Sequence, residues 1–406
     1  MKQITKCEVC DCTNLEAVLN LGNHPLCDDL IPIGENYNCS EYPIEILYCK
    51  ICNTAHQRFQ VEKKILFPKE YHYRSRFTSD VLKGMESLVN SYSKKFGSLD
   101  GKNILDIGSN DGSLLDCFKK KGANITFGVE PTNAYLDSEF RGHKIINGYF
   151  DTLTAEKICS HKILFDVITF TNVFAHIDDL KGLLSSLKKV VSKKTIVIIE
   201  NHYLGSVLDG YQFDTFYHEH PRTYSLNSFL YIAKVLGMDI LDVEFPVRYG
   251  GNIRVFLGQY KSQSIKLEKL IDKEGSFLEK FKTLNQMISI WSSKKKESIF
   301  KGVDGSKVAA KAFPGRSAIL IKMLGLNEDN ILAVYEKVGS MKIGHYVPGT
   351  RIPILSDEDL FKDISNTNKI LNLAWHISSE IENYLNDNGF KGDIIQILDP
   401  KEYSND

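Results

Sequence analysis

The chain has 406 residues, of which 43% are hydrophobic and 25% are charged. These are the proportions of an ordinary globular protein rather than a disordered one, and the length predicts two or three domains. Because the formal net charge is only -1, the composition also argues against a nucleic-acid-binding protein, whose surface would carry a surplus of Lys and Arg.

The chain shows no sign of a membrane or secretory protein. No apolar run reaches the roughly 18 residues that span a bilayer, and the N-terminal stretch MKQITKCEVC lacks the apolar region of a signal peptide. We therefore expect a cytoplasmic protein. The nine cysteines are an odd number, and in a reducing compartment two CxxC pairs favour metal ligation over disulfides.

Residues 1–65 are predicted to form a small zinc-binding module. They are rich in Cys, Asn and Pro, and their apolar runs are too short to build a core. Two CxxC pairs with the same spacing can each supply two thiolates to one tetrahedral zinc ion, which leaves no open position for water. Cys12 and Cys27 lie between the pairs, so one ligand could be misassigned. The predicted ligands of this structural zinc are Cys7, Cys10, Cys49 and Cys52.

The next stretch, YHYRSRFTSD, collects hydroxyl groups and an arginine before a helix. Such groups could hold a phosphate or a sugar. A solvent-exposed loop explains the same pattern equally well. The candidate residues here are Tyr71, Tyr73, Arg74, Ser75 and Ser79.

From Asn103 onward, apolar runs alternate with helical stretches: NILDIG, NITFGVE, FDVITFTNVFAHI and KTIVIIENHYL. This alternation predicts a parallel, doubly wound α/β sheet. In ILDIGSNDGSLL a glycine-rich turn follows a strand and opens a helix, where free N–H groups and close backbone approach suit a ligand. Glu130 ends the next strand, where its carboxylate can accept hydrogen bonds from both ribose hydroxyls.

Two ligands compete for this turn. A dinucleotide favours GxGxxG, whereas here the spacing is GxNxG after an acidic residue, which resembles the turn that holds S-adenosylmethionine in class I methyltransferases. We favour S-adenosylmethionine and keep a dinucleotide enzyme as the alternative. The predicted cofactor-binding residues are Asp106, Gly108, Asn110, Gly112, Ser113, Glu130, Pro131, Phe150 and Asn172.

The segment FDTFYHEHPRTYS gathers histidine, glutamate and tyrosine after the strand TIVIIE. His and Glu side by side supply a base near neutral pH and a carboxylate that orients it. His176 ends another strand, and the carboxyl ends of parallel strands share one edge. Several of these side chains could instead be hydrogen-bonded framework residues. The predicted catalytic residues here are Tyr217, Glu219, His220 and His176, with His218 and Tyr224 also in the cluster.

The last part of the chain repeats the strand and helix rhythm. RVFLGQY predicts another strand, a Lys-rich helical stretch runs from about Ser264 to Lys301, and KVAAKAFPGRSAILIKMLG and NILAVYEKVG predict a second, smaller α/β unit. The expected domains are 1–65, 66–248 and 249–406.

Together, the CxxC pairs, LGNHPL, YHYRS, LDIGSNDGSLL, VFAHIDD, FDTFYHEH, YGGNIRVF, PGTRIPI and LAWH resemble the sugar C-methyltransferases that act on nucleotide-linked deoxy-4-ketosugars. The resemblance covers nearly the whole chain. It implies a zinc-binding N-terminal module, a central Rossmann-like class I methyltransferase domain that binds S-adenosylmethionine, and a C-terminal Rossmann-like α/β domain that helps to hold the substrate.

The resemblance also implies roles for single residues. His220 and Glu219 would be the leading acid/base pair, completed by Tyr217, His176 and one of Tyr71 or Tyr73. Further residues would bind the nucleotide sugar, although Lys311 follows KVAA rather than the glycine-rich turn of many members. The implied substrate-binding residues are Ser75, Ser79, Asn252, Arg254 and Lys311.

The chemistry of carbon methylation agrees with this set of residues. A proton next to a ketone must be removed, and the resulting enolate attacks the methyl donor, so the protein has to supply a base and hydrogen-bond donors. We predict methylation at C3 by a monomer. The rival interpretations are an O- or N-methyltransferase and a non-catalytic, zinc-stapled binding protein.

Overall fold

The computed structural model describes residues 1–67, 74–77, 79–259, 267–302 and 307–402. The chain forms two compact units, each assembled from segments that are far apart in the sequence. Unit 1 consists of Met1–Ala17, Leu47–Val207 and Glu219–Leu278. Unit 2 consists of Val18–Ile46, Leu208–His218 and Glu279–Asp406.

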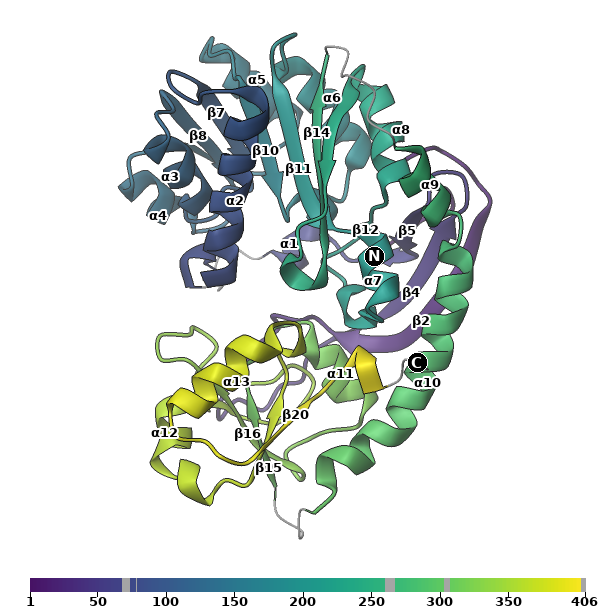
Figure 1. The fold of residues 1–406 in the computed structure, drawn as a ribbon, viewed down its shortest axis with the longest axis vertical. Coiled ribbons are helices and arrows are strands. Elements are labelled where there is room, and N and C mark those ends of the chain that lie inside the picture. The colour runs from purple at the N-terminus through teal and green to yellow at the C-terminus, as the bar shows by residue number, and fades with distance from the viewer. Residues whose placement is uncertain (68–73, 78, 260–266, 303–306, 403–406) are drawn as a thin grey trace. The chain divides into compact units, whose positions relative to one another are not determined.

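Unit 1 is built on a seven-stranded sheet in the order β13-β14-β11-β10-β7-β8-β9 (Figure 1). The strands from β7 to β11 run parallel, whereas β14 is antiparallel to both β11 and β13. The predicted α/β class and four of the expected strands are confirmed. The strands are β7 (Asn103–Ile107), β8 (Ile125–Glu130), β9 (Lys144–Asn147), β10 (Val167–Thr171), β11 (Ile196–His202), β13 (Asp239–Glu244) and β14 (Asn252–Gly258).

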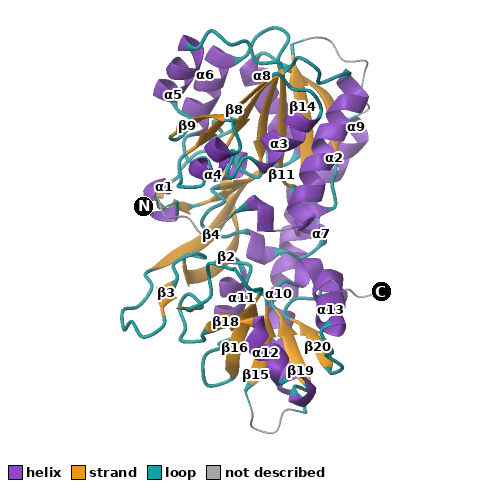
Figure 2. Ribbon diagram, turned by 90° about the vertical axis from the view of Figure 1, so that its left-hand side faces the viewer, coloured by secondary structure: helices purple, strands orange, loops and turns teal. Residues whose placement is uncertain are grey.

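Helices cover both faces of this sheet (Figure 2). One hydrophobic cluster joins the sheet to α2 and α3, and a second joins it to α5, α6 and α8. Strands that are buried on both faces must be apolar almost throughout. These strands could therefore be recognised from the sequence. The helices of unit 1 outside the zinc segment are α2 (Ser79–Phe96), α3 (Ser113–Lys120), α4 (Tyr135–Phe140), α5 (Thr152–Ser160), α6 (Leu180–Val190), α8 (Leu226–Leu236) and α9 (Glu268–Glu274).

The N-terminal segment contains more regular structure than its composition suggests. A four-stranded sheet has the order β12-β5-β4-β2. The chain crosses from unit 1 to unit 2 within β2 and returns to unit 1 within β4. All four residues of β5 are buried. The elements are β1 (Lys2–Gln3), β2 (Leu15–Pro25), β3 (Ile31–Pro32), β4 (Glu41–Cys49), β5 (Thr54–Gln57), β6 (Phe59–Gln60), α1 (Lys63–Leu66) and β12 (Arg222–Thr223).

Unit 2 contains a five-stranded parallel sheet in the order β18-β16-β15-β19-β20. The predicted smaller α/β unit is therefore present. The predicted domain boundary at 248/249 comes just before β14, which pairs inside the sheet of unit 1. The elements are α10 (Phe277–Phe300), β15 (Val308–Lys311), α11 (Ser317–Met323), β16 (Ile331–Glu336), β17 (His345–Tyr346), β18 (Ile354–Ser356), α12 (Asp357–Lys362), β19 (Lys369–Asn372), α13 (Ser378–Asp387) and β20 (Asp393–Gln396).

Short helices mark several connections. The helix α7 (Leu204–Asp209) follows β11, and the remaining turns are 3-10 helices. They are η1 (Ser75–Phe77), η2 (Phe174–His176), η3 (Phe213–Thr215), η4 (Arg248–Gly250), η5 (Ile364–Asn366), η6 (Trp375–Ile377) and η7 (Pro400–Glu402).

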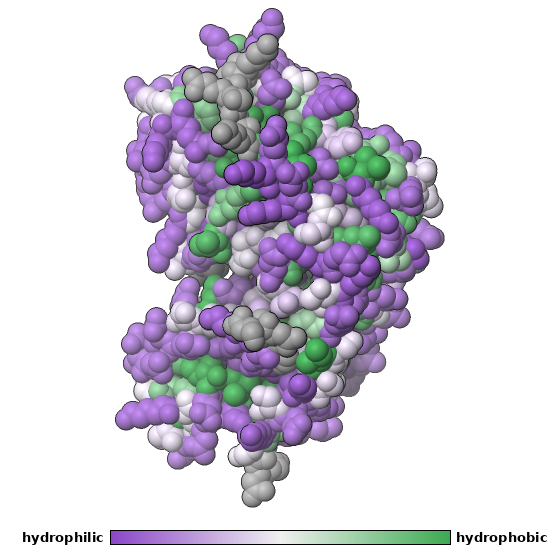
Figure 3. Space-filling view, turned by 45° about the vertical axis from the view of Figure 1, so that its right-hand side comes forward, coloured by the Kyte–Doolittle hydropathy of each residue, from purple (hydrophilic) through white to green (hydrophobic). Residues whose placement is uncertain are grey.

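Among the described residues, no helix is both long and apolar enough to cross a bilayer. The face drawn in Figure 3 is mostly hydrophilic, with small apolar areas scattered over it. Single exposed hydrophobic side chains of this kind are normal on a folded protein.

Candidate functional site

The glycine-rich turn between β7 and α3 has a backbone that few side chains tolerate. Gly108, Asn110 and Gly112 have φ angles of 72°, 47° and 80°. A Cβ atom on Gly108 would lie 2.4 Å from Cγ2 of Val173. Position 108 therefore requires glycine both for its left-handed conformation and for lack of space.

Glu130, at the end of β8, is bonded directly to this turn. Its Oε2 accepts a hydrogen bond from the backbone N–H of Asn110 at 2.9 Å, and its Oε1 accepts from the backbone N–H and Oγ1 of Thr132 at 2.9 and 2.6 Å. Burial raises the pKa of Glu130, and these hydrogen bonds oppose the rise. Carboxylate oxygens have further lone pairs, so the oriented Glu130 can still accept from ribose hydroxyls.

Asp106 lies inside β7 and is also buried. Its Oδ1 accepts a hydrogen bond of 2.7 Å from Oγ1 of Thr169 on the neighbouring strand β10. Burial raises the pKa of Asp106 to about 7, with a smaller contribution from the charge of Glu130. Its carboxyl group can therefore be protonated near neutral pH, and its contact with the cofactor stays a prediction.

The other predicted cofactor residues lie around the same sheet edge. Ser113 begins α3, and its hydroxyl donates to Asp111 at 2.7 Å. Phe150 is buried edge-on against Phe170. Asn172 follows β10 with a φ of 54°, and Pro131 follows Glu130. Because β7, β8 and β10 are parallel neighbours, their carboxyl ends bring these residues to one edge, where open α/β sheets bind ligands.

The segment before α2 is attached to the turn rather than standing apart as a surface loop. The backbone N–H of Ser75 donates to Oδ1 of Asn110 at 3.0 Å, and that of Arg76 donates to Oδ2 of Asp111 at 3.0 Å. Arg74 extends the attachment through Asp137, at 2.8 Å. The sequence did not indicate this role for Arg74 and Arg76.

Of the other candidates in this stretch, Ser79 begins α2 with an exposed side chain. Tyr71 and Tyr73 lie outside the described residues. The substrate contacts predicted for Ser75 and Ser79 stay predictions.

Three histidines meet in unit 1. The ring centroid of His220 lies 4.8 Å from that of His176, which ends η2, and 5.3 Å from that of His202, which ends β11. The sequence singled out two of the three, but His202 was missed although its strand was predicted. Since β10 and β11 are parallel neighbours, the cluster lies at the same edge of the sheet as the cofactor turn.

His176 has a defined tautomer. Its Nδ1 lies 2.8 Å from the carbonyl oxygen of Glu219, which can only accept, so Nδ1 carries the proton. Its Nε2 therefore has the lone pair. Burial lowers the pKa of His176 to about 4, despite hydrogen bonds to the backbone of Glu219 and Asn172 that raise it. The ring is neutral at pH 7.

Glu219 joins this cluster with its carboxylate as well, since Oε2 lies 4.0 Å from Nδ1 of His176. Tyr217 and His218 precede it and belong to unit 2. His218 is a framework residue, because its Nε2 donates to the carbonyl of Tyr42 at 2.9 Å. Tyr224 is too, because it is fully buried and accepts a hydrogen bond of 2.8 Å from Nε of Arg222.

Asn252 and Arg254, predicted to bind substrate, are buried side chains of β14 that hold Glu200 of β11. Nδ2 of Asn252 donates to Oε1 of Glu200 at 3.0 Å, and Nε of Arg254 donates to Oε2 at 2.6 Å. Arg254 also pairs with Glu244 on the neighbouring strand β13 at 2.7 Å. These contacts fix the antiparallel strand to the parallel sheet, and a substrate contact stays a prediction.

Lys311, at the end of β15 in unit 2, is also engaged within the protein. Its Nζ donates to Oδ2 of Asp357 at 2.9 Å and to the carbonyl of Tyr335 at 3.1 Å, and only 2% of the side chain is exposed. Burial lowers the pKa of Lys311, while the ion pair with Asp357 opposes this. The structure supports a framework role for Lys311.

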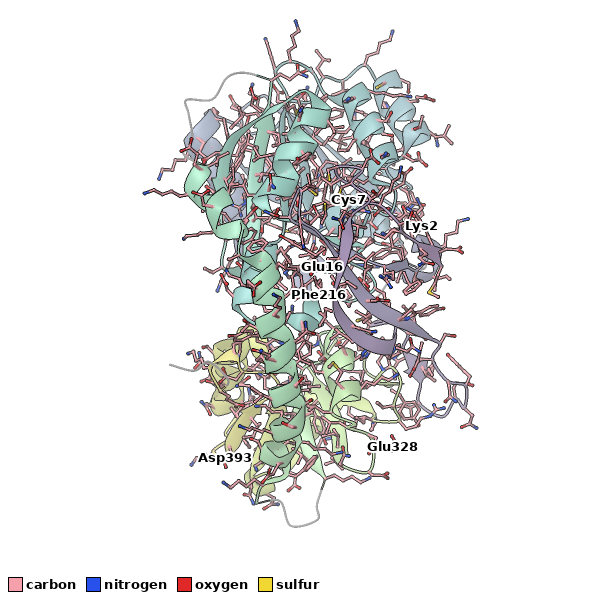
Figure 4. The ribbon with its side chains drawn as sticks, turned by 90° about the vertical axis from the view of Figure 1, so that its right-hand side faces the viewer. Lys2, Cys7, Glu16, Phe216, Glu328 and Asp393 are labelled. Carbon is pink, nitrogen blue, oxygen red and sulfur yellow. The ribbon has the colours of Figure 1, made fainter. Side chains whose placement is uncertain are left out.

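The four predicted metal ligands come together in unit 1 (Cys7 is labelled in Figure 4). The sulfur atoms of Cys7, Cys10, Cys49 and Cys52 all lie within 4.8 Å of one another. Four sulfurs bound to one zinc at about 2.3 Å would be separated by about 3.8 Å, so the group fits a tetrahedral zinc ion.

Residues around the cysteines support this assignment. The backbone N–H groups of Val9 and Cys10 donate to Sγ of Cys7, both at 3.4 Å. His56, which the sequence did not single out, lies with Nε2 3.3 Å from the same sulfur. Cys12 donates instead to the carbonyl of Asn14, and Cys27 belongs to unit 2, so neither is part of the cluster.

Three protein families match consecutive parts of the chain. A zinc-binding domain matches residues 7–67, a methyltransferase domain residues 77–243, and the C-methyltransferase C-terminal domain residues 247–395. The C-methyltransferase NovU of Streptomyces niveus is 26% identical over 391 residues, which are 94% of this chain and 92% of that protein. The chain is an S-adenosylmethionine-dependent methyltransferase and is similar to a C-methyltransferase over most of its length. Its cofactors are S-adenosylmethionine and a structural zinc ion.

Methyltransferases of other kinds resemble smaller shares of the chain. Ubiquinone biosynthesis O-methyltransferase of Actinobacillus pleuropneumoniae serotype 7 (strain AP76) is 29% identical over 106 residues, which are 24% of this chain and 44% of that protein. The solved structure of magnesium protoporphyrin IX methyltransferase from Synechocystis PCC 6803 with bound SAH has a TM-score of 0.35 and 14% identity, over 45% of this chain and 84% of that chain. A structural likeness this weak supports no conclusion about function.

Proposed function

We propose that this methyltransferase transfers a methyl group to carbon next to the ketone of a nucleotide-linked deoxy-4-ketosugar, at C3. The observation that carries the proposal is the cluster of His176, Glu219 and His220 at the sheet edge that also carries the cofactor turn. Similarity to a C-methyltransferase over most of the chain supports transfer to carbon.

The reaction needs one proton to leave and one carbon–carbon bond to form. A base removes the proton at C3, and the electron pair left behind is delocalised onto the ketone oxygen as an enolate. S-adenosylmethionine supplies the methyl group: the new C–C bond forms as the bond from sulfur to methyl breaks, and the ketone is restored. The protein has to hold the base and to donate hydrogen bonds to the enolate oxygen.

We assign the base to His220. His176 is the less suitable base, because burial lowers its pKa to about 4 and Nδ1–H is already donated to the carbonyl of Glu219. A base works best when its pKa lies near the working pH. His176 then orients Glu219 beside His220, and Tyr217 donates to the enolate oxygen.

We also propose that the protein acts as a monomer in the cytoplasm, on a small molecule. The two CxxC pairs support this compartment, since such pairs favour metal ligation where thiols are kept reduced. Light scattering of the purified protein would test the monomer, and a stable dimer would contradict it.

The proposed base is tested by substituting His220→Asn. We expect turnover to fall by about 10² to 10⁴ while the dissociation constant for S-adenosylmethionine stays nearly unchanged, since general base catalysis contributes on this scale. The readout is exchange of the proton at C3 with deuterated solvent, followed by NMR with a TDP- or UDP-linked 4-keto-6-deoxyhexose and S-adenosylhomocysteine.

His161→Asn is the matched control, because His161 is an exposed residue directly after the last residue of α5. Wild-type exchange and turnover in His220→Asn would show that another residue is the base. A product that carries the new methyl on oxygen or nitrogen would show that the O- or N-methyltransferase alternative is correct.

A further inference from the structure

The segment that follows His220 is paired with the zinc-binding module. The strand β12 runs antiparallel to β5, with Arg222 opposite His56 and Thr223 opposite Ala55. The backbone N–H of Gln57 donates to the carbonyl of Pro221 at 2.9 Å. The strand β5 begins two residues after Cys52, so the residue next to the proposed base is bonded to a strand that the second CxxC pair leads into.

The first CxxC pair reaches the same segment through a side chain. Glu8 lies between Cys7 and Cys10, and its carboxylate forms an ion pair with Nη1 of Arg222. Lys2 and Gln60 hold that carboxylate from the other sides, with hydrogen bonds of 2.7 and 2.8 Å. The orientation of Glu8 is thus fixed by the metal-binding turn and by its neighbours.

Arg222 is fully buried, and its guanidinium group forms hydrogen bonds to several segments of the chain. Its Nε donates to Oη of Tyr224 at 2.8 Å, its Nη1 also donates to the carbonyl of Asp178 at 3.3 Å, and its Nη2 donates to the carbonyl of Ile177. Ile177 directly follows His176 in the chain. One guanidinium group therefore joins the turn of the first CxxC pair, the segment after His176 and the segment after His220.

A second set of contacts links the other knuckle to the end of the same segment. The carbonyl of Cys52 accepts hydrogen bonds of 3.2 Å from the hydroxyls of both Ser225 and Ser228, and Oγ1 of Thr54 lies 2.8 Å from Oγ of Ser228. Ser225 and Ser228 cap the N-terminus of α8. Both halves of the zinc site thus support residues 221–228.

We propose that Arg222 is a positioning residue through which the zinc module holds His176 and His220 in place. This inference rests on the proposed function of the two histidines. Its physical basis is that a planar guanidinium with several hydrogen bonds fixes its partners in direction as well as distance. The zinc ion, by fixing the turn that carries Glu8, contributes to the geometry of the reaction without touching the substrate.

The test replaces Glu8→Gln, which keeps the size of the side chain and removes its charge. We expect one zinc per chain by metal analysis and wild-type affinity for S-adenosylmethionine by calorimetry. We expect kcat and the rate of C3 proton exchange to fall by about 10- to 100-fold, because a displacement on the order of 1 Å has effects of this size. Amide hydrogen exchange of residues 219–224 should become faster.

The matched control is Asp11→Asn, which makes the same change at an exposed carboxylate beside the same knuckle. Asp11 pairs instead with Lys181 of α6, at 2.7 Å. This variant should keep wild-type kcat and hydrogen exchange. If Glu8→Gln does not accumulate as folded protein, Arg222→Lys, which keeps the charge but loses the fork of donors, provides the same comparison.

Wild-type kcat and proton exchange in Glu8→Gln, with zinc bound, would overturn the inference. A loss of kcat that only follows a loss of zinc would overturn it as well, since Glu8 would then matter for metal binding alone. The proposed function is judged separately by His220→Asn: if that variant is inactive while Glu8→Gln is normal, only the inference fails.

Discussion

At the scale of one residue, Glu130, a predicted cofactor residue, is oriented by hydrogen bonds within the protein. Two backbone N–H groups and one hydroxyl hold its carboxylate in place. Its position at the end of the second strand made it predictable. The hydrogen bond to Asn110 was not predictable, because it depends on the unusual backbone of the turn.

Replacement of Glu130→Gln should weaken the binding of S-adenosylmethionine. Loss of hydrogen bonds from ribose hydroxyls to a carboxylate costs about 2 to 4 kcal/mol, or roughly 30- to 1000-fold in affinity. Thr132→Val is the control, because it removes one hydrogen bond to Oε1 and leaves the carboxylate in place. An unchanged dissociation constant in calorimetry would refute the ribose contact.

The low pKa of His176 predicts a pH-dependent contribution to stability. Between about pH 6.5 and 4 the unfolded chain binds a proton at this residue and the folded protein does not, so stability is lost as the pH falls through this range. From pH 7.5 to 5 the loss amounts to about 1 to 2 kcal/mol.

Chemical denaturation of wild type and His176→Gln at the two pH values measures this contribution. The difference in unfolding free energy between the proteins should shrink by that amount at pH 5. A difference that is the same at both pH values would show that His176 titrates normally in the folded protein. Tm measurements by calorimetry at the same pH values provide a second readout.

At the scale of elements, the parallel strands could be predicted and the partners of polar residues could not. The strands β7, β8, β10 and β11 are apolar because helices cover both faces of their sheet. The substrate role of Asn252 and Arg254 is implied by the family resemblance and stays a prediction. Their partner Glu200 could not be predicted, because it is some 50 residues away in the sequence and only the pairing of β11 with β14 brings them together.

The zinc-binding segment also shows that contacts between residues distant in the sequence could not be predicted. Its cysteine spacing predicted the ligands, but its strands were missed because β5 pairs with β12, more than 160 residues later. Buried residues of a strand whose partner is so distant give little local signal. The support that the zinc module gives to the histidine segment was therefore invisible in the sequence.

Cys49→Ser should remove the zinc ion and destabilise unit 1. Zinc binding to such a site contributes directly to folding, so we expect a loss of at least about 3 kcal/mol in unfolding free energy. Cys12→Ser, in the same segment but outside the cluster, is the matched control and should keep one zinc per chain. Full zinc content in Cys49→Ser, by metal analysis, would show that the ligand set is wrong.

At the scale of the molecule, the segment that carries the proposed base crosses from unit 2 to unit 1 along the chain. Residues up to His218 belong to unit 2 and residues from Glu219 to unit 1. Within unit 2, η3 is held by Asp214, which accepts a hydrogen bond of 2.9 Å from Nε1 of Trp375 and lies 3.3 Å from Nε of Arg316. Separate contacts thus hold the part of FDTFYHEH that belongs to unit 2 and the part that belongs to unit 1.

We propose above all that the enzyme transfers the methyl group to carbon next to a ketone. The most direct test of this transfer uses S-adenosylmethionine labelled with ¹³C in its methyl group. The enzyme is incubated with it and a TDP- or UDP-linked 4-keto-6-deoxyhexose, and NMR then locates the label in the product. We predict that the labelled methyl is bonded to C3 of the sugar and that the original proton at that carbon is gone. A labelled methyl bonded to oxygen or nitrogen, with the C3 proton retained, would contradict the claim.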